Sequence, residues 1–247
     1  MWTFNYWVIL FVMFMAFSFV GYIVEIIDVY IEKHRLMFSR GFLIGPYIPI
    51  YGIGALIMYL FLSRYKEDYF VLFTTSMLIC SFLEYIVSYA MEKIFHLRWW
   101  DYSDKKFNIN GRIYLLNSIL FGVSGLIVCS FFGPWLYEKI SNWSLLWLYI
   151  IAGTLLVIFV VDIIVSNVIV TKLKHRAYEY TEIDATGEIK ERIVLELKKH
   201  LGLYSRVFKA FPNIFSFDSR LKEINNIINR AKKELKNIKD KFRSMML

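Results

Sequence analysis

Long apolar stretches separated by short polar segments make up the first two thirds of the chain. Each is near the ~20 residues that a helix needs to cross a bilayer. The five stretches are residues 6–27, 42–62, 69–91, 113–136 and 145–170. The remainder, from residue 172 to residue 247, is rich in charge. The pattern predicts an all-α integral membrane protein, with a bundle of about five transmembrane helices in residues 1–171 and a helical tail in residues 172–247.

Composition agrees with the membrane class. The chain is 57% hydrophobic and 19% aromatic, and its mean hydropathy is +0.47, which exceeds the range typical of soluble domains. Cys80 and Cys129 lie inside apolar runs and do not indicate a disulfide framework. The first span lacks a basic leading segment and ends in Glu25 and Asp28. These features indicate a retained helix rather than a cleaved signal peptide.

The distribution of basic residues predicts the topology. The loops at residues 31–41 and 92–112 hold eight lysines and arginines, whereas the other loops and the N-terminus hold three. The tail holds 18 of the 29 basic residues. Because basic loops stay in the cytoplasm, we expect the N-terminus outside and the C-terminus inside a bacterial cell membrane. Because the anionic cytoplasmic leaflet lies beside this positive charge, we do not expect the charge to bind nucleic acid.

The tail contains a heptad pattern within residues 218–245. Its apolar positions alternate spacings of three and four, as in a coiled-coil seam. They are Leu221, Ile224, Ile228, Ala231, Leu235, Ile238, Phe242 and Met245. One interpretation is a helix that packs on its own tail or lies on anionic lipid. The other is a coiled coil with a second copy, giving a homodimer, or with a partner protein.

A polar stripe interrupts the third span. Glu84, Ser88, Glu92 and His96 are spaced by four and therefore share one helical face. Ionisable groups in hydrocarbon face a bundle interior or a wet cavity. Carboxylate and imidazole on one face could ligate a divalent metal. Because no HExxH or CxxC pattern is present, we expect neither a metal nor another cofactor, and the stripe could equally line a helix interface.

A glycine- and proline-rich segment, SRGFLIGPYIPIYGIG at residues 39–54, begins the second expected span. Proline removes a backbone donor and glycine weakens a helix. Such a backbone at membrane depth must be buried in protein or must line a cavity. One interpretation is a re-entrant or unwound start to the span, whose freed carbonyls suit a substrate or ion site. The other is a kinked helix packed closely through its glycines.

The acidic residues of the spans gather at one depth. Given the expected topology, Glu25, Glu84 and Asp162 fall in the inner half of the bilayer, where polar groups must pair or meet water. The pattern favours a polar cavity open to the cytoplasm, and the alternative is a structural network of salt bridges. The candidate cavity or substrate-binding residues are Glu25, Arg40, Gly45, Pro46, Pro49, Tyr51, Glu84, Ser88, Glu92, Trp100, Asp101, Asn108, Asn110, Arg112 and Asp162.

Two motifs resemble a known family. The runs RGFLIGPYIPIYG at residues 40–52 and LEYIVSYAMEKIFHLRWWDYSDKKFNINGR at residues 83–112 are similar to the ABC-transporter permease family of CmpB type. The likeness extends to GYIVE at residues 21–25 and FPNIFS at residues 211–216. The resemblance implies a bacterial plasma-membrane protein with several spans. It also implies, more weakly, a subunit that works with a separate ATPase.

The sequence departs from an ordinary importer permease and leaves two functions open. It contains no Walker A loop, so an ATPase would be another chain, and it has no EAA-type coupling loop. The first hypothesis is a transport subunit whose cavity holds a small polar or charged solute. The second is a membrane-embedded enzyme acting on a lipid-linked or amphiphilic substrate at the inner leaflet. There, Glu84 or Glu92 would be the general base, Asp101 the acid and Arg112 the anion holder.

Overall fold

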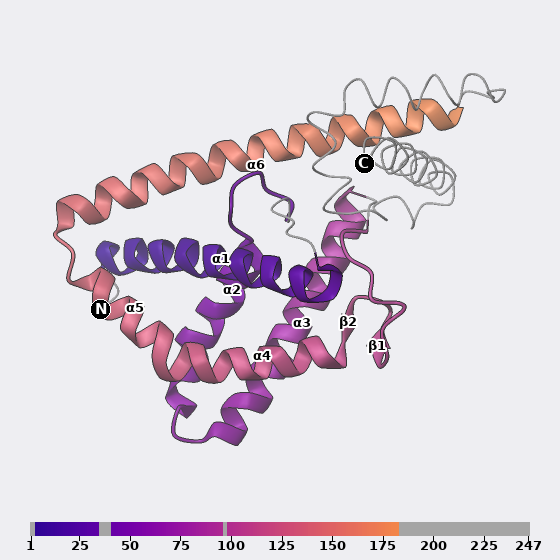
Figure 1. Ribbon diagram of the computed structural model, residues 1–247. Helices are drawn as coiled ribbons and strands as arrows, with labels where there is room; N and C mark the ends of the chain where they lie inside the picture. The colour runs from indigo at the N-terminus through magenta and orange to yellow at the C-terminus, as the bar shows by residue number, and fades with distance from the viewer. Residues whose placement is uncertain (1–2, 35–40, 96–97, 183–247) are drawn as a thin grey trace, which may run out of the picture. The chain divides into compact units, whose positions relative to one another are not determined.

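The computed structural model of the protein describes residues 3–34, 41–95 and 98–182, and these residues are almost entirely helical (Figure 1). They belong to two compact units, one made of Met1–Tyr89 and Asp101–Ser166 and the other of Ala90–Trp100 and Asn167–Leu247. Four expectations concern segments outside the described residues. These are the roles of Arg40 and His96, the FPNIFS segment, and the heptad helix at residues 218–245.

Four helical segments in the described part of the chain are long and apolar enough to cross a membrane. They are Phe4–Ile31, Tyr69–Phe95, Leu115–Ser141 and Leu145–Lys172. The first lies in α1 (Phe4–Lys33), the second is α3 (Tyr69–Phe95) and the last lies in α6 (Leu145–Glu182). The chain is thus a multi-pass membrane protein. Helix α6 continues without a break beyond residue 171, where we expected the membrane domain to end.

The second expected span, residues 42–62, is not one regular helix. Residues 41–48 are unwound, and α2 (Pro49–Ile57) begins at a proline. A π-helical turn, η1 (Met58–Leu62), and a 3₁₀ turn, η2 (Ser63–Tyr65), follow it. Proline disfavours helical backbone at the residue before it, and its own ring is accommodated at the first helical position. Pro46 and Pro49 therefore explain where the unwound stretch lies and where α2 begins.

The span at residues 115–141 also contains a distortion. Helix α4 (Leu115–Ile127) passes through a π-helical turn, η3 (Val128–Phe132), into α5 (Gly133–Ser141). Pro134 has no N–H to donate to the turn before it, which loosens the helix there. The Cys129 thiol donates a hydrogen bond to the Met58 carbonyl at 3.3 Å. The two π-helical turns are therefore in contact, and this thiol satisfies a carbonyl in the distorted region.

A small hairpin joins α3 to α4, although we expected an all-α protein. Strand β1 (Asn108–Ile109) pairs antiparallel with β2 (Ile113–Tyr114). Asn110 and Gly111 in the turn have φ values of 52° and 66°. Positive φ at both central residues is typical of a type I′ turn, which matches the twist of a two-stranded hairpin.

Helices α1 and α2 pack closely through glycines. A Cβ atom on Gly52 would lie 2.2 Å from Ser18 Oγ and 2.6 Å from the Phe14 carbonyl oxygen. A Cβ atom on Gly21 would lie 2.3 Å from Tyr51 Cβ. Small residues at a membrane-helix interface allow the backbones this approach. The glycine-rich segment thus combines the two features that we treated as alternatives, an unwound start and close packing.

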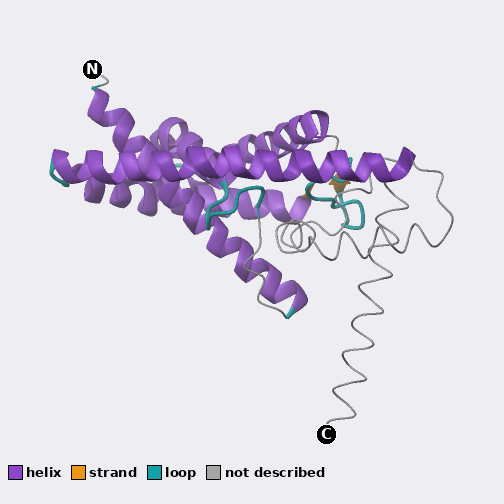
Figure 2. Cartoon of the chain, turned by 90° about the horizontal axis from the view of Figure 1, so that it is seen from above, coloured by secondary structure: helices purple, strands orange, loops and turns teal. Residues whose placement is uncertain are grey.

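Figure 2 shows the helices of the described chain from above. The apolar core of the first unit is formed by buried residues of α1, α2, α3, α5, α6 and the two π-helical turns. Met13, Leu72 and Cys129 are fully buried at its centre. Many large apolar side chains of α3, α4 and α6 point outward instead, as expected for helices whose surroundings are lipid. The buried polar residues therefore stand out, because few positions on these helices face the protein interior.

Candidate functional site

Asp162 on α6 fixes the unwound segment. Its carboxylate accepts hydrogen bonds from the backbone N–H groups of Ile44 at 2.8 Å and Gly45 at 2.7 Å. The Tyr47 hydroxyl donates at 2.6 Å and the Ser166 hydroxyl at 2.9 Å. Only 8% of Asp162 is exposed. We call these five residues the Asp162 clamp. In it, the Asp162 carboxylate is a charged acceptor for backbone N–H groups of a non-helical segment.

The unwound segment makes a second connection. The Ile48 N–H donates to the Ser18 carbonyl on α1 at 3.0 Å, and Gly41 has a φ of 87°, which favours glycine. Irregular backbone survives at membrane depth only where protein groups satisfy it. The segment is therefore held from both sides, by α1 through Ser18 and by α6 through the Asp162 clamp.

Two carboxylates meet tyrosine and asparagine side chains in the same unit. The Tyr51 hydroxyl donates to Glu25 Oε2 at 3.0 Å. Asn117 Nδ2 donates to Glu84 Oε1 at 2.8 Å, and the Tyr102 hydroxyl makes a longer contact to the same oxygen at 3.4 Å. We call these five residues the acid–tyrosine cluster. They come from α1, α2, α3, α4 and the connection before β1, so the fold alone brings them together.

Electrostatics confirm that the two acids share surroundings. Burial raises the pKa of the Tyr102 hydroxyl well above its ordinary value, and the carboxylates of Glu84 and Glu25 raise it further. Tyr102 therefore remains a protonated donor at physiological pH. Its ring contacts that of Tyr114, with centroids 4.7 Å apart. The carboxylate of Glu25 also lies within electrostatic range of Glu84.

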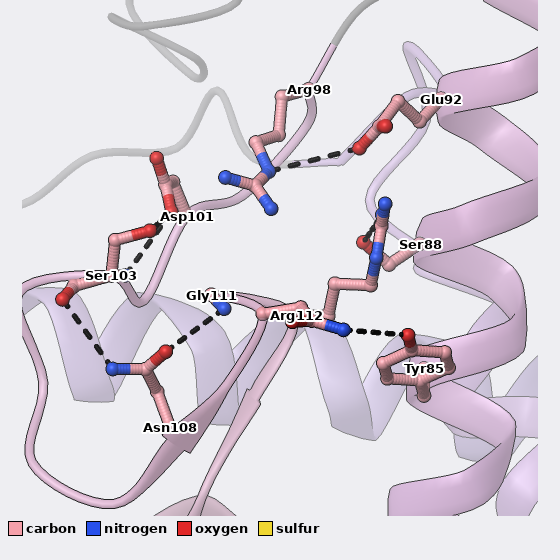
Figure 3. A network of polar contacts seen from close by, with 10 residues as sticks. Tyr85, Ser88, Glu92, Arg98, Asp101, Ser103, Asn108, Gly111 and Arg112 are labelled. Atoms are coloured by element: carbon pink, nitrogen blue, oxygen red, sulfur yellow. Dashed lines mark hydrogen bonds and ion pairs between the residues drawn. The ribbon is translucent and has the colours of Figure 1, made fainter. Parts of the chain in front are cut away.

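Arg112 at the hairpin is buried against α3 (Figure 3). Its guanidinium carbon lies 5.6 Å from the centroid of the Tyr85 ring and 5.5 Å from that of Tyr89. Its Nη1 donates to Ser88 Oγ at 3.3 Å, and 7% of the residue is exposed. Tyrosine faces attract a guanidinium through their quadrupoles. This arrangement, the Arg112 cage, places a fixed positive charge beside the polar stripe of α3.

The turn residues near Arg112 bond mainly to one another. Asn108 Oδ1 accepts a hydrogen bond from the Gly111 N–H at 2.9 Å (Figure 3). Asn110 Nδ2 donates to the Tyr85 hydroxyl at 3.0 Å. The N–H and hydroxyl of Ser103 donate to Asp101 Oδ1 at 3.1 and 2.5 Å. Side-chain bonds of this kind stabilise turns. Asp101, Asn108 and Asn110 therefore shape the connection that carries Tyr102 and Arg112.

Glu92 belongs to the other unit and pairs with Arg98. Arg98 Nε lies 3.7 Å from Glu92 Oε2, and 6% of the Glu92 side chain is exposed. Trp99 is buried and packs edge-on against Phe95, with ring centroids 5.7 Å apart. Trp100 is half-buried. At Glu92 the structure has an ion pair, which is the arrangement expected of the salt-bridge alternative.

The candidate residues thus fall into separate groups. Gly45 belongs to the Asp162 clamp, whereas Pro46 and Pro49 set the backbone around it. Glu84, Ser88 and Glu92 are 7%, 5% and 6% exposed, so the polar stripe of α3 does face the protein interior. Among the described residues, no group of three or more His, Cys, Asp and Glu side chains is placed to hold a metal ion.

Sequence reasoning missed three contacting residues. Tyr47, Tyr102 and Asn117 donate directly to the intramembrane acids. Asn117 could have been identified from the sequence, because a carboxamide at the start of an apolar span needs a hydrogen-bond partner. Tyr47 and Tyr102 could not, since tyrosines are common at membrane interfaces for other reasons.

Comparison with known proteins places the chain in a family. The model of the family described as "Putative ABC-transporter type IV" matches residues 12–167. These residues run from α1 into α6 and contain the Asp162 clamp, the acid–tyrosine cluster and the Arg112 cage. No curated protein and no solved structure matches the chain significantly. Since the match covers more than half of the 247 residues, the chain belongs to this family, and its four long apolar helices make it a multi-pass membrane protein.

Proposed function

We propose that the chain is the membrane subunit of a transporter for a small polar or charged solute, energised by a separate ATPase chain. Its polar cavity opens to the cytoplasm and is walled by the acid–tyrosine cluster and the unwound segment at residues 41–48. Family membership supports the transport role. The N-terminus is outside and the C-terminus inside, as the loop charges predict.

The acid–tyrosine cluster is the observation that carries this proposal. Placing one acidic side chain at mid-membrane costs about 2.5–3.5 kcal/mol on insertion scales. Two such acids, Glu25 and Glu84, lie here with two tyrosines and an asparagine, all from different segments. If the role were purely structural, apolar side chains would pack these helices together without the free-energy cost of removing charged groups from water. We therefore assign solute recognition to this cluster in a conformation more open than the one described, in which only 7% of Glu84 is exposed.

The Asp162 clamp has a different part in the proposal. Both carboxylate oxygens already accept hydrogen bonds from the unwound segment and from Ser166. Asp162 therefore fixes the wall of the cavity instead of contacting solute. The clamp keeps the carbonyl groups of residues 41–48 out of a regular helix, which leaves them available to a bound solute.

The experiment is recovery of the full chain from its native membrane through a tag on the C-terminus, with copurifying proteins identified by mass spectrometry. We expect a stoichiometric ATPase whose recovery is lost in Leu235→Asp, at an apolar position of the heptad pattern. Asn237→Asp places the same charge off that pattern and should retain the ATPase. Reconstituted into liposomes, the complex should hydrolyse ATP faster with its solute present, and Glu84→Gln should abolish this stimulation.

One observation favours the enzyme hypothesis as second candidate. Glu25, Glu84 and Asp162 all lie in the C-terminal halves of their apolar segments, whereas alternating access requires polar groups in both halves of the membrane. A membrane-embedded enzyme acting on a lipid-linked or amphiphilic substrate at the inner leaflet needs only one. In that case the chain would purify without an ATPase, and Glu84→Gln would stop conversion of the lipid while leaving the protein folded. That pair of results would overturn the transport proposal.

A further inference from the structure

The two carboxyl oxygens of Glu84 have different surroundings. Oε1 accepts hydrogen bonds from Asn117 and Tyr102, whereas Oε2 is fully buried and has no hydrogen-bond partner among the residues that the structure describes. No lysine or arginine forms an ion pair with Glu84 within the described residues. An ionised carboxylate buried in this way is far more costly than a neutral one.

No positively charged group faces Glu84 from the neighbouring elements within the described residues, so only the hydrogen bonds from Asn117 and Tyr102 would offset a negative charge there. Glu25 on α1 is itself an acid, and Tyr51 on α2 and Tyr102 lie within electrostatic range. Cys80 lies on α3 itself, and Asn117 on α4 is neutral. A second carboxylate in this position adds repulsion to the cost of burial. The surroundings therefore favour the uncharged form of Glu84.

Space decides which ligand this oxygen can take. Oε2 has essentially no accessible surface, so no room for a water molecule, a metal ion or an ammonium group adjoins it. A proton needs no room. We propose that Glu84 is a proton-binding site within the membrane domain, occupied in this conformation, with the proton on Oε2 and the carbonyl oxygen Oε1 held by Asn117 and Tyr102.

Proton exchange would proceed through the connection before β1. Asn117 lies inside a membrane span, whereas Tyr102 lies in the polar segment between α3 and the hairpin, and its N–H is tied to the Gly111 carbonyl at 2.8 Å. Movement of this connection would admit water to the carboxyl group. The proton then passes from Glu84 to that water, leaving a carboxylate. This inference does not depend on the transport proposal, because it concerns the charge of one side chain.

The test is infrared difference spectroscopy of the full-length protein in lipid nanodiscs at neutral pH, in H₂O and in D₂O. We expect the C=O stretching band of a neutral carboxylic acid, shifted down in D₂O and lost in Glu84→Gln. Glu67→Gln, at a side chain that is 88% exposed, should retain the band. Absence of the band from the wild type, or its persistence in Glu84→Gln, would overturn the proposal.

Tyr102→Phe provides a second readout that does not require the Gln variant to fold. Removing one donor from Oε1 weakens hydrogen bonding to the carbonyl oxygen, so the band should move to higher frequency. Tyr65→Phe, a substitution of the same kind at a residue remote from the cluster, should leave the frequency unchanged. A band that does not respond to Tyr102→Phe would belong to another carboxyl group and would overturn the assignment.

Discussion

The carboxylate of Asp162 accepts a 2.7 Å hydrogen bond from the backbone N–H of Gly45, a residue 117 positions earlier in the chain. This contact joins the last membrane helix to the unwound segment before α2. It converts an apparent defect, a stretch of backbone without helical hydrogen bonds, into a fixed structure.

Asp162→Ala should release the unwound segment. The substitution leaves the N–H groups of Ile44 and Gly45 and the Tyr47 hydroxyl without their acceptor. Hydrogen bonds to a charged group contribute about 1.5–3 kcal/mol each, although their effects do not add fully. We expect a fall in the midpoint of thermal unfolding in detergent, measured by circular dichroism. Asp28→Asn, at an exposed acid of α1, is the control, and an equal loss there would contradict the assignment.

Gly52→Ala should separate α1 from α2. The new methyl group would lie 2.2 Å from Ser18 Oγ and 2.6 Å from the Phe14 carbonyl oxygen, and the backbone atom cannot rotate away. Overpacking of this kind costs about 1–3 kcal/mol. Gly153→Ala on α6 is the matched control, because no atom lies within 4 Å of its added Cβ. There, the gain in helix propensity should leave stability unchanged or raised, by up to about 1 kcal/mol. Equal effects at both glycines would argue against close packing at Gly52.

Arg112→Lys should weaken the Arg112 cage although the charge is kept. A lysine ammonium cannot present a planar face to the Tyr85 and Tyr89 rings together with a directed bond to Ser88. We expect a loss of about 1–2 kcal/mol, in the range of partly desolvated cation–π pairs, measured by chemical unfolding. Arg64→Lys removes an exposed guanidinium that lies 4.8 Å from the Tyr65 ring and should cost much less. If both substitutions lower the free energy of unfolding equally, the buried Arg112 cage contributes no more to stability than the exposed Arg64–Tyr65 contact.

Tyr102→Phe should alter the alkaline limb of the stability profile. Because burial and the two acids raise the pKa of Tyr102 in the folded protein, the folded state keeps a proton that the unfolded state loses near pH ~10. Above that pH the folded state therefore binds more protons, and stability falls as pH rises. The variant should lack this contribution, so the wild type's advantage at neutral pH should shrink or reverse above pH ~10. A constant difference across this range would show that Tyr102 ionises normally.

Much of the membrane architecture could be predicted from the sequence. Apolar length marked the spans, and the four-residue spacing from Glu84 to Glu92 correctly placed these side chains on one inward face, because hydrocarbon excludes ionisable groups from the lipid side. Pro46 and Pro49 indicated an irregular start to α2 for a local reason, the missing N–H and the restricted backbone. The hairpin turn was also local, since Asn110 and Gly111 tolerate positive φ, but a four-residue pairing is too short to register as strands.

What the sequence by itself determined was which residues must be buried together in the protein and at which points the helices lose their regular backbone. What the tertiary structure decided was the pairing. Asp162 could have met an arginine or the backbone of residues 44 and 45, and Glu84 could have met Arg112 or Asn117. Solvation and backbone chemistry act on each residue separately, so their effects can be predicted from the sequence. Partner choice depends on how helices distant in sequence approach one another, which glycine contacts and π-helical turns settle only in three dimensions.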